Sequence, residues 1–409
     1  MSRLRVLVIG AGLGGLALAQ GLRQAGVEVE VFERDASPRG RMQGYRLRLL
    51  PEGEQALRDC APQRVQELLT VTSNKRYNHG WSAYDENLVP QWTPTFDDPR
   101  GDADESMGAL DRATLRRCLL AGLDDVVHFG RRFVRCSVSG DGGAVVAHFA
   151  DGGTATGDVL VAADGANSQV RRHLRPGDQP TDLGVRTILS RTPRDRAIEA
   201  GLPEVVRDRT VYVIGSDGHH LGLMPMVYRT PPRDAARRLW PGLEFDYNDD
   251  YYMSVFNAQT DVLGMSDADF FAMDGEALRS LVLERTASWH PDLRAMFEHA
   301  EPAETFPIAM RVKLPVEHWE PGPVIPLGDA WHTMPPSGGF GANTALRDAA
   351  ELSAALAAVD RGERDLADAS GAYQTAMAEY ATEAINTSLR IAQWSIHIDM
   401  PVQAKEAAQ

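Results

Sequence analysis

The order of elements at the start of the chain constrains its fold more than any other feature. An apolar strand, a glycine-rich turn, an amphipathic helix and a second strand are predicted over residues 4–9, 10–15, 16–22 and 27–32. Gly10, Gly12 and Gly15 have the G-x-G-x-x-G spacing, which lets backbone N–H groups at a helix start approach a dinucleotide diphosphate. A chance glycine-rich turn would not place all four elements in register. The segment therefore predicts a βαβ dinucleotide-binding unit.

Glu33 follows the second predicted strand directly. A carboxylate at this place accepts hydrogen bonds from the two hydroxyls of a ribose and repels a 2′-phosphate. The site is therefore expected to bind FAD or NAD, and not NADP.

A second glycine-rich loop lies in the last third of the chain. Residues 328–343 read GDAWHTMPPSGGFGAN and lead directly into a helical pattern over residues 344–352. Gly338, Gly339 and Gly341 would let backbone N–H groups approach a ligand, and the helix presents its positive end to the same place. Asp329 adds a carboxylate at the start of the loop. The segment indicates that a large anionic cofactor lies across it.

Two further segments complete this set of motifs. A predicted strand over residues 158–163 ends in Asp164, Gly165 and the sequence ANSQVR, and residues 110–119 contain Arg112. Together with the two glycine loops, these segments resemble the FAD-dependent aromatic hydroxylase family, the single-component (group A) flavoprotein monooxygenases. The resemblance extends from the first strand to about Tyr373.

The resemblance implies the fold. It implies an α/β protein with a Rossmann-like FAD-binding domain of the GR2 type, a second, mainly antiparallel β-sheet domain for the substrate, and C-terminal helices. The expected division is an FAD-binding domain over residues 1–75, 105–176 and 303–380, a substrate domain over residues 76–104 and 177–302, and a helical tail over residues 381–409. After Asn343 the chain is expected to be helical, with Gly362 and Gly371 interrupting the helices.

The resemblance also implies the cofactor site. FAD would be bound non-covalently, and NADPH or NADH would act as a transient electron donor, because no second strand–glycine–helix pattern follows residue 40. The residues expected to contact FAD are Gly10, Gly12, Leu13, Gly15, Glu33, Arg34, Arg41, Arg112, Asp164, Gly165, Gly328, Asp329, Pro336, Gly338, Gly339, Gly341, Ala342 and Asn343.

In the resembled family, reduced FAD and O2 form a flavin C4a-hydroperoxide, which inserts one oxygen atom into an electron-rich substrate. The expected reaction is hydroxylation of an aromatic or polyketide-like small molecule. Epoxidation, Baeyer–Villiger insertion and an FAD-dependent oxidase or reductase acting on a carbon–carbon bond stay open as alternatives, because the motifs bind FAD without selecting what reacts with it. A flavin halogenase is disfavoured, since the sequence after Gly80 and Trp81 does not continue as G-W-x-W-x-I-P.

Few residues are candidates for the chemistry itself. Alternation along the strand expected at residues 44–49 puts Arg46 and Arg48 on one face, where they would reach the flavin or an anionic substrate group, or form a solvated edge. His332 is a candidate for proton transfer, although a histidine that hydrogen-bonds the loop is favoured. His219 and His220 are expected in an exposed turn. Substrate contacts are expected from Arg48, Tyr212, Met224, Met226, Pro335 and Phe340.

Composition restricts the partners more than the reaction. The chain has 409 residues and a net charge of −15, and a nucleic-acid partner is not expected, because phosphate neutralisation requires a basic surface. Cys60, Cys118 and Cys136 lack C-x-x-C spacing and are expected as reduced thiols of a cytoplasmic protein, without disulfides or a metal site. No stretch is long and apolar enough to span a membrane. The expected partners are the substrate, O2 and NAD(P)H, in a monomer or homodimer.

Overall fold

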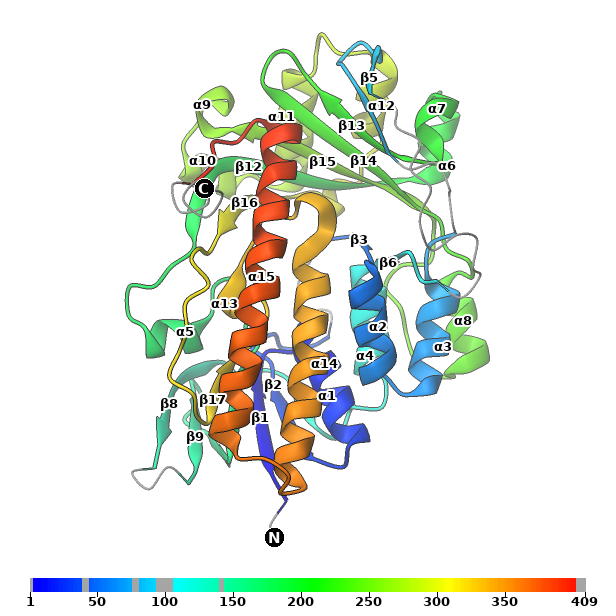
Figure 1. The fold of residues 1–409 in the computed structure, drawn as a ribbon. Helices are drawn as coiled ribbons and strands as arrows, with labels where there is room; N and C mark the ends of the chain where they lie inside the picture. The colour runs from blue at the N-terminus through cyan, green and yellow to red at the C-terminus, as the bar shows by residue number, and fades with distance from the viewer. Residues whose placement is uncertain (1–2, 39–43, 76–80, 93–105, 140–142, 402–409) are drawn as a thin grey trace.

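The computed structural model of the chain describes residues 3–38, 44–75, 81–92, 106–139 and 143–401. One half of the molecule is built on a parallel five-stranded sheet and the other on a seven-stranded sheet (Figure 1). The order of the parallel sheet is β17 (Val324–Pro326), β11 (Val159–Ala162), β1 (Arg5–Ile9), β2 (Glu28–Phe32) and β7 (Val127–His128). The helix α1 (Leu13–Gln24) connects β1 to β2, which completes the predicted βαβ unit.

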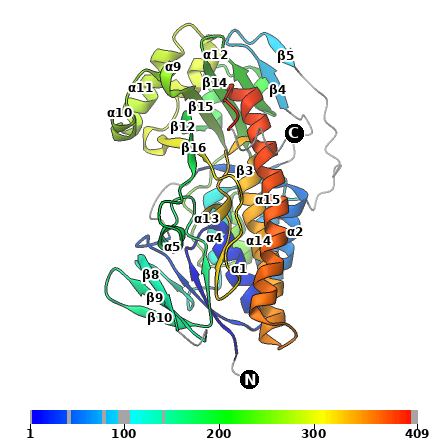
Figure 2. The same cartoon turned by 60° about the vertical axis from the view of Figure 1, so that its left-hand side comes forward.

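Both faces of the parallel sheet are covered. Alternation along β1 turns Val6 and Val8 toward a cluster of helices and turns Leu7 and Ile9 toward a second, antiparallel sheet. The helices are α1, α2 (Pro51–Cys60), α3 (Gln63–Thr72), α4 (Arg112–Leu120), α8 (Pro232–Leu239), α14 (Phe340–Asp360) and α15 (Leu366–Ile396). The antiparallel sheet consists of β10 (Thr154–Gly157), β9 (Val145–Phe149) and β8 (Phe133–Val138), and Figure 2 shows it on the side opposite α15.

The seven-stranded sheet forms the other half. Its order is β16 (Phe306–Val312), β12 (Thr181–Pro193), β15 (Tyr251–Gln259), β14 (His219–Met226), β13 (Thr210–Ile214), β4 (Trp81–Tyr84) and β5 (Pro90–Trp92). Every neighbouring pair is antiparallel except β13 with β4. Short helices cover its outer face: α6 (Arg194–Glu199), α7 (Glu204–Arg207), α9 (Thr260–Leu263), α10 (Asp267–Ala272), α11 (Gly275–Arg285), α12 (Pro291–Glu298) and η1 (Pro302–Glu304).

Short elements lie between the two halves. The strands β3 (Arg46–Arg48) and β6 (Ala109–Asp111) pair antiparallel. The helix α5 (Gln169–Leu174) follows the segment that begins at Asp164, and α13 (Asp329–His332) and η2 (Ser337–Gly339) lie within the second glycine loop. The helix α15 runs past both halves, from the free end of α14 to the seven-stranded sheet (Figures 1 and 2).

The predicted fold class is confirmed: a Rossmann-like half is joined to a mainly antiparallel sheet, with long C-terminal helices. The expected break at Gly371 is wrong, because α15 continues through it. The helix is held by buried side chains along its length, including Tyr373, Met377 and Ala381, and this packing outweighs the low helix propensity of one glycine. Gly362 does lie between α14 and α15.

The expected domain boundaries differ from the sheets in two places. Strand β16 lies within the range 303–380 expected for the FAD-binding domain, yet it pairs with β12 in the seven-stranded sheet. The boundary at residue 381 falls inside α15. The division into domains stays a prediction.

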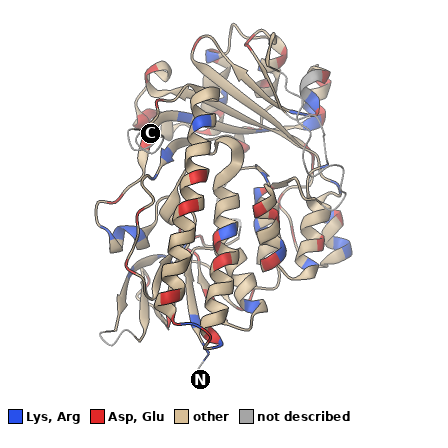
Figure 3. Cartoon of the chain, viewed as in Figure 1, with Lys and Arg blue, Asp and Glu red and all other residues tan. Residues whose placement is uncertain are grey.

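Figure 3 shows acidic residues and basic residues on the helices that face the viewer. Among the described residues, no helix has both the length and the apolar character needed to cross a membrane. The three cysteines are buried and unpaired.

Candidate functional site

The first glycine loop is packed against the ends of β1 and β11. Gly10 has a φ of 110°, and a Cβ added to it would lie 2.4 Å from the carbonyl oxygen of Ala163. A Cβ on Gly15 would lie 2.2 Å from the carbonyl oxygen of Gly10. Both distances are shorter than any side chain tolerates, so only glycine lets α1 begin this close to the sheet.

Gly12, unlike Gly10 and Gly15, is not packed against other protein atoms. A Cβ added there would meet no protein atom within 4 Å. Gly12 is the N-cap of α1, and no side chain caps this helix end. The first N–H groups of α1 and its positive end therefore face open space, which is the arrangement that binds a diphosphate.

Glu33 is buried at the end of β2, beside this loop. Its carboxylate accepts hydrogen bonds from the backbone N–H of Ala11 at 2.8 Å and of Asp35 at 2.9 Å. The carboxylate thus also holds the glycine loop in place, while its contact with a ribose stays a prediction. Arg34 is exposed next to it, and Arg41 lies outside the described residues.

Asp164 lies on the other side of the loop, after β11. One carboxylate oxygen accepts the backbone N–H of Gln169 at 2.6 Å and of Val170 at 3.3 Å, at the start of α5. The other oxygen, Oδ1, is buried and has no hydrogen-bond partner in the described part of the chain. Burial raises the pKa of Asp164 in spite of these hydrogen bonds. A Cβ on the neighbouring Gly165 would again meet no protein atom within 4 Å, so open space lies beside this buried, unpaired oxygen.

The second glycine loop is held from inside by His332. Its Nε2 donates to Oδ2 of Asp348 at 2.6 Å, and neither side chain is exposed. Asp348 also accepts the backbone N–H of Gly328 at 2.8 Å and the hydroxyl of Tyr380 at 2.7 Å. Burial opposes protonation of the ring, but the attraction of Asp348 outweighs it and raises the pKa of His332. This network agrees with a histidine that holds the loop.

The charges of Asp329 and Arg112 interact at the start of this loop. A Cβ on Gly341 would lie 3.7 Å from Oδ1 of Asp329, so the carboxylate of α13 lies beside the start of α14. Desolvation raises the pKa of Asp329, and the charges of His332 and Arg112 act against that shift. Arg112 is the first residue of α4, where its backbone N–H donates to the carbonyl oxygen of Tyr45 at 2.7 Å. The expected segment 328–343 is thus less open than a loop, since residues 329–332 form a helical turn.

Asn343 fastens the start of α14 to the strand β3. Its Oδ1 accepts the backbone N–H of Leu50 at 2.8 Å, and its Nδ2 donates to the carbonyl oxygen of Arg48 at 2.9 Å. The preceding residues of η2, up to the N-cap Gly339, have no side-chain cap. The positive end of α14 therefore points, uncapped by a side chain, toward the space beside Arg48.

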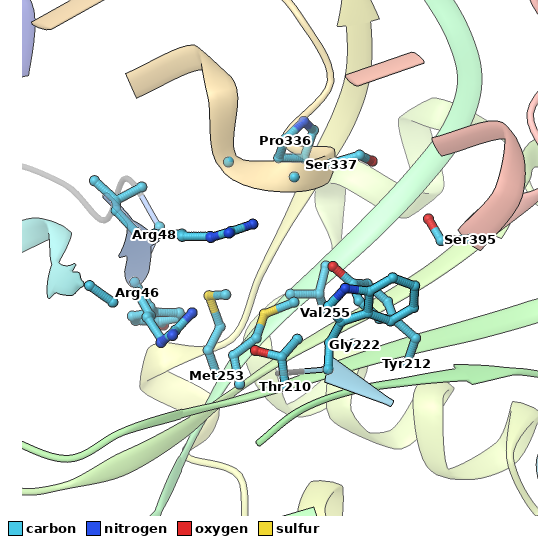
Figure 4. A pocket seen from close by; sticks show the side chains of 18 of the residues that line it. Arg46, Arg48, Thr210, Tyr212, Gly222, Met253, Val255, Pro336, Ser337 and Ser395 are labelled. Atoms are coloured by element: carbon cyan, nitrogen blue, oxygen red, sulfur yellow. The ribbon is translucent and has the colours of Figure 1, made fainter. Parts of the chain in front are cut away.

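That space is a cavity of about 630 Å³ between the second glycine loop and the inner face of the seven-stranded sheet (Figure 4). Successive side chains along each strand point to opposite faces of the sheet. One set faces the outer helices, and the other set forms the floor of the cavity. The floor consists of Tyr212 from β13, His220, Gly222 and Met224 from β14, and Met253, Val255 and Asn257 from β15. The opposite wall is formed by Pro336, Ser337, Gly338 and Gly339, with Arg46, Arg48 and Arg112 at one end and Trp81 and Trp394 at the other.

The cavity brings together only part of the expected substrate site. Arg48, Tyr212 and Met224 contribute to its lining. Met226 belongs instead to a neighbouring apolar cluster with Tyr45 and Tyr251, because β14 has passed beyond the cavity at that position. Among the described lining residues there is no contribution from Pro335, Phe340 or His332.

His220 is one of the lining residues that sequence reasoning missed. The expected exposed turn is wrong for both His219 and His220, since β14 already begins at His219 and buries both side chains. Burial lowers the pKa of His220 to about 4, and its Nδ1 has no hydrogen-bond partner among the described residues. The alternation of His220, Gly222 and Met224 was the available signal, and it would have required starting the strand two residues earlier.

These features fit FAD. The open space at Gly12, the orphaned Asp164 oxygen and the uncapped start of α14 are respectively suited to a diphosphate, a hydroxyl and a flavin ring with partial negative charge. Fold and site together define a flavoprotein of the Rossmann type with a cavity next to the place for the flavin.

Comparisons with known proteins identify the family. A family model described as NAD(P)-binding Rossmann-like domain matches residues 8–67, and one described as FAD binding domain matches residues 264–388. The solved structure of a Photorhabdus luminescens protein designated an FAD-containing monooxygenase is 30% identical, has a TM-score of 0.80, and the match covers 96% of this chain and 99% of that one. The chain belongs to the family of single-component FAD-dependent monooxygenases, and its cofactor is FAD.

Other relatives differ in length. A dual O-methyltransferase/FAD-dependent monooxygenase of Cercospora beticola is 31% identical over 91% of this chain, and this chain spans 44% of that protein's length. The 6-hydroxynicotinate 3-monooxygenase of Pseudomonas fluorescens is 26% identical, and the match covers 93% of this chain and 89% of the relative. This chain thus spans less than half the length of the first relative and most of the length of the second.

Proposed function

We propose that this chain hydroxylates an aromatic or heteroaromatic small molecule, using NADPH or NADH and O2. In this reaction the substrate gains one oxygen atom, the second oxygen atom leaves as water, and the nicotinamide supplies two electrons and a hydrogen. The observation that carries the proposal is the single cavity bounded by the second glycine loop on one side and by apolar and aromatic side chains of the sheet on the other.

Bound FAD would supply the redox chemistry between the nicotinamide, O2 and the substrate. The chain's own contribution is a shaped cavity. Leu189, Met253 and Ile308 give apolar surface to its lining, and the rings of Tyr212 and Trp394, whose centroids lie 5.9 Å apart, can orient a flat substrate. The start of α14 would stabilise negative charge on the reduced flavin.

His220 and Asn257 offer hydrogen bonds to the substrate. They face each other on neighbouring strands at the cavity floor. Because its pKa lies near 4, His220 is neutral at pH 7 and can accept or donate one hydrogen bond without carrying charge. A neutral imidazole with so low a pKa is better suited to orient a substrate hydroxyl through a hydrogen bond than to remove the proton of that hydroxyl.

The names of the relatives support an aromatic substrate, since 6-hydroxynicotinate is a heteroaromatic ring. Their chemistry also supports hydroxylation over the carbon–carbon oxidase or reductase reaction, epoxidation and Baeyer–Villiger insertion. The nicotinamide donor would bind transiently, because FAD would fill the one G-x-G-x-x-G sequence of the chain. We further propose a cytoplasmic protein, for which three unpaired cysteines are typical, as a monomer or homodimer.

The deciding experiment is a screen of aromatic metabolites for those that accelerate NAD(P)H oxidation by the FAD-loaded protein, followed by mass spectrometry under isotopically labelled O2. We expect a product that carries one labelled oxygen atom. An oxidase or reductase would give a product without labelled oxygen, and that result would overturn the proposal.

Anaerobic rapid mixing tests the order of events. With the correct substrate present, NADPH or NADH should bleach the flavin much faster than without it, because substrate binding changes the population of the reducible state. Equal rates with and without a substrate that is nevertheless oxygenated would contradict this gating.

A further inference from the structure

The cavity is basic although the chain as a whole is acidic. Among the described residues its lining contains five basic side chains, Arg46, Arg48, Lys75, Arg112 and Arg209, and one acidic side chain, Asp208, whereas the net charge of the chain is −15. Asp208 is itself bonded to Arg194 at 3.2 Å and therefore does not neutralise the cavity. The excess of positive charge is local and belongs to the site.

Three of the five basic residues interact with polar or acidic groups of the protein. Arg209 donates to the hydroxyl of Ser82 at 3.0 Å, Lys75 attracts the carboxylate of Asp250, and Arg112 attracts Asp329 at the cofactor loop. Arg46 and Arg48 differ from these three. Among the described residues neither has an ion pair with a carboxylate, and Nε of Arg46 is buried without a hydrogen-bond partner.

The geometry aims both side chains into the cavity. They are two residues apart on β3, so alternation places them on one face of the strand. In Figure 4, Arg48 extends into the space below Pro336 and Ser337, and Arg46 lies toward Met253. Burial, and to a smaller degree the charge of Arg48, lowers the pKa of Arg46 to about 10, and the guanidinium still remains charged at neutral pH. Two like charges in a partly desolvated space are costly unless a ligand supplies the opposite charge.

We propose that Arg46 and Arg48 form an anion-binding subsite that holds an ionised oxygen group of the aromatic substrate, a carboxylate or a phenolate. This inference rests on the proposed function and adds the charge of the substrate to it. Guanidinium groups suit this task, because their planar donors bind such oxygens through two parallel, charge-assisted hydrogen bonds. The anion would lie at one end of the cavity and the ring would extend toward Tyr212 and Trp394.

The test uses the FAD-loaded full chain and pairs of probes that have the same shape and differ in charge. 2-Naphthoate is compared with 2-naphthamide for the carboxylate, and pentafluorophenol, which is ionised at neutral pH, with pentafluoroanisole for the phenolate. Binding is measured by titrating the change in flavin absorbance. At least one anionic probe should bind at least about tenfold more tightly than its neutral partner. The pair with the larger ratio identifies the kind of acid.

Variants then locate the effect. Arg46→Gln and Arg48→Gln should each reduce that ratio to near one, whereas the lysine substitutions should retain part of it. The matched control is Arg390→Gln, which removes an exposed arginine of α15 that is not among the described residues lining the cavity and should leave the ratio unchanged. FAD content is measured for every variant. If one glutamine variant does not hold FAD, the other variant and the unmodified protein still decide the result.

Two outcomes overturn the subsite. The first is equal binding of anionic and neutral probes, or no binding of either anion below about 10 mM. The second is an unchanged ratio in both glutamine variants. If Arg48→Gln then also alters the flavin spectrum, the arginines are assigned to the flavin instead of the substrate. Failure of the monooxygenase proposal is recognised separately, because it removes labelled product while leaving the binding ratios intact.

Discussion

The cofactor wall and the substrate wall of the site are built in different ways. The cofactor wall extends from the first glycine loop to the second and is shaped by backbone, that is, by glycine turns and helix starts, while the buried His332–Asp348 side-chain pair holds Gly328 in place. The substrate wall is made of side chains that alternate along three strands and come from distant parts of the chain. A backbone site tolerates few changes because its shape depends on the fold, whereas a side-chain site can change its ligand without losing the fold.

Gly15→Ala and Gly12→Ala should give the largest effects and test the backbone wall. In Gly15→Ala the new Cβ overlaps the carbonyl oxygen of Gly10, so we expect the loss of FAD binding together with about 1–3 kcal/mol of stability. In Gly12→Ala the new Cβ meets no protein atom, so stability should change by less than about 0.5 kcal/mol while FAD affinity falls sharply. Unfolding of the FAD-free proteins and FAD titration measure the two quantities. Equal destabilisation by both substitutions would contradict the open space at Gly12.

Asp329→Ala should weaken FAD by about ten- to a hundredfold, since a charged acceptor contributes about 1.5–3 kcal/mol. The carboxylate lies beside the start of α14 and near Arg112, where the flavin end of the cofactor is expected. Asp329→Asn is the matched control, because it keeps an acceptor oxygen, and it should lose less affinity. FAD titration of both variants decides the point. Unchanged affinity in Asp329→Ala would remove this residue from the cofactor site.

Tyr212→Leu should have a smaller effect, and only on the substrate wall. The ring of Tyr212 is in contact with those of Trp81 and Trp394, and its loss should cost an aromatic ligand about 0.5–1.5 kcal/mol, which is a few-fold in affinity. FAD affinity should stay the same, and this contrast with Asp329→Ala is the test. A comparable loss of FAD in Tyr212→Leu would show that the two walls are not independent.

The smallest effect should be a change with pH in the stability contributed by the His332–Asp348 pair, since a change of pH alters only the charge of one ring. The pKa of His332 is raised in the folded protein, because Asp348 outweighs the cost of burial. Its charged pair with Asp348 therefore stabilises the fold fully below the unfolded pKa of about 6.5. This contribution is lost as the pH rises through the higher folded pKa. The difference in unfolding free energy between the protein and His332→Gln should accordingly shrink from pH 6 to alkaline pH, and a difference that grows would reverse the sign of the argument.

The same contrast explains what could be predicted from the sequence. Gly10, Gly12, Gly15 and the 328–343 segment were recognisable because a backbone site depends on spacing along a continuous stretch of chain. His220 and the position of Met226 outside the cavity were not, since both depend on where a strand starts and where the opposite wall ends. The expected break at Gly371 was wrong for a related reason: the contacts that hold α15 straight come from residues far away in the sequence.

The course of α15 has a practical consequence for work with this protein. Its middle is tied to the cofactor loop through Tyr380 and Asp348, and its last turn, Trp394, Ser395 and Ile396, forms part of the cavity wall. The described N-terminus lies at the opposite end of the molecule (Figure 1). An affinity tag, a fusion partner or a surface anchor is therefore better attached at the N-terminus. A truncation within the final helix would open the cavity to solvent even where it spares every residue that contacts FAD.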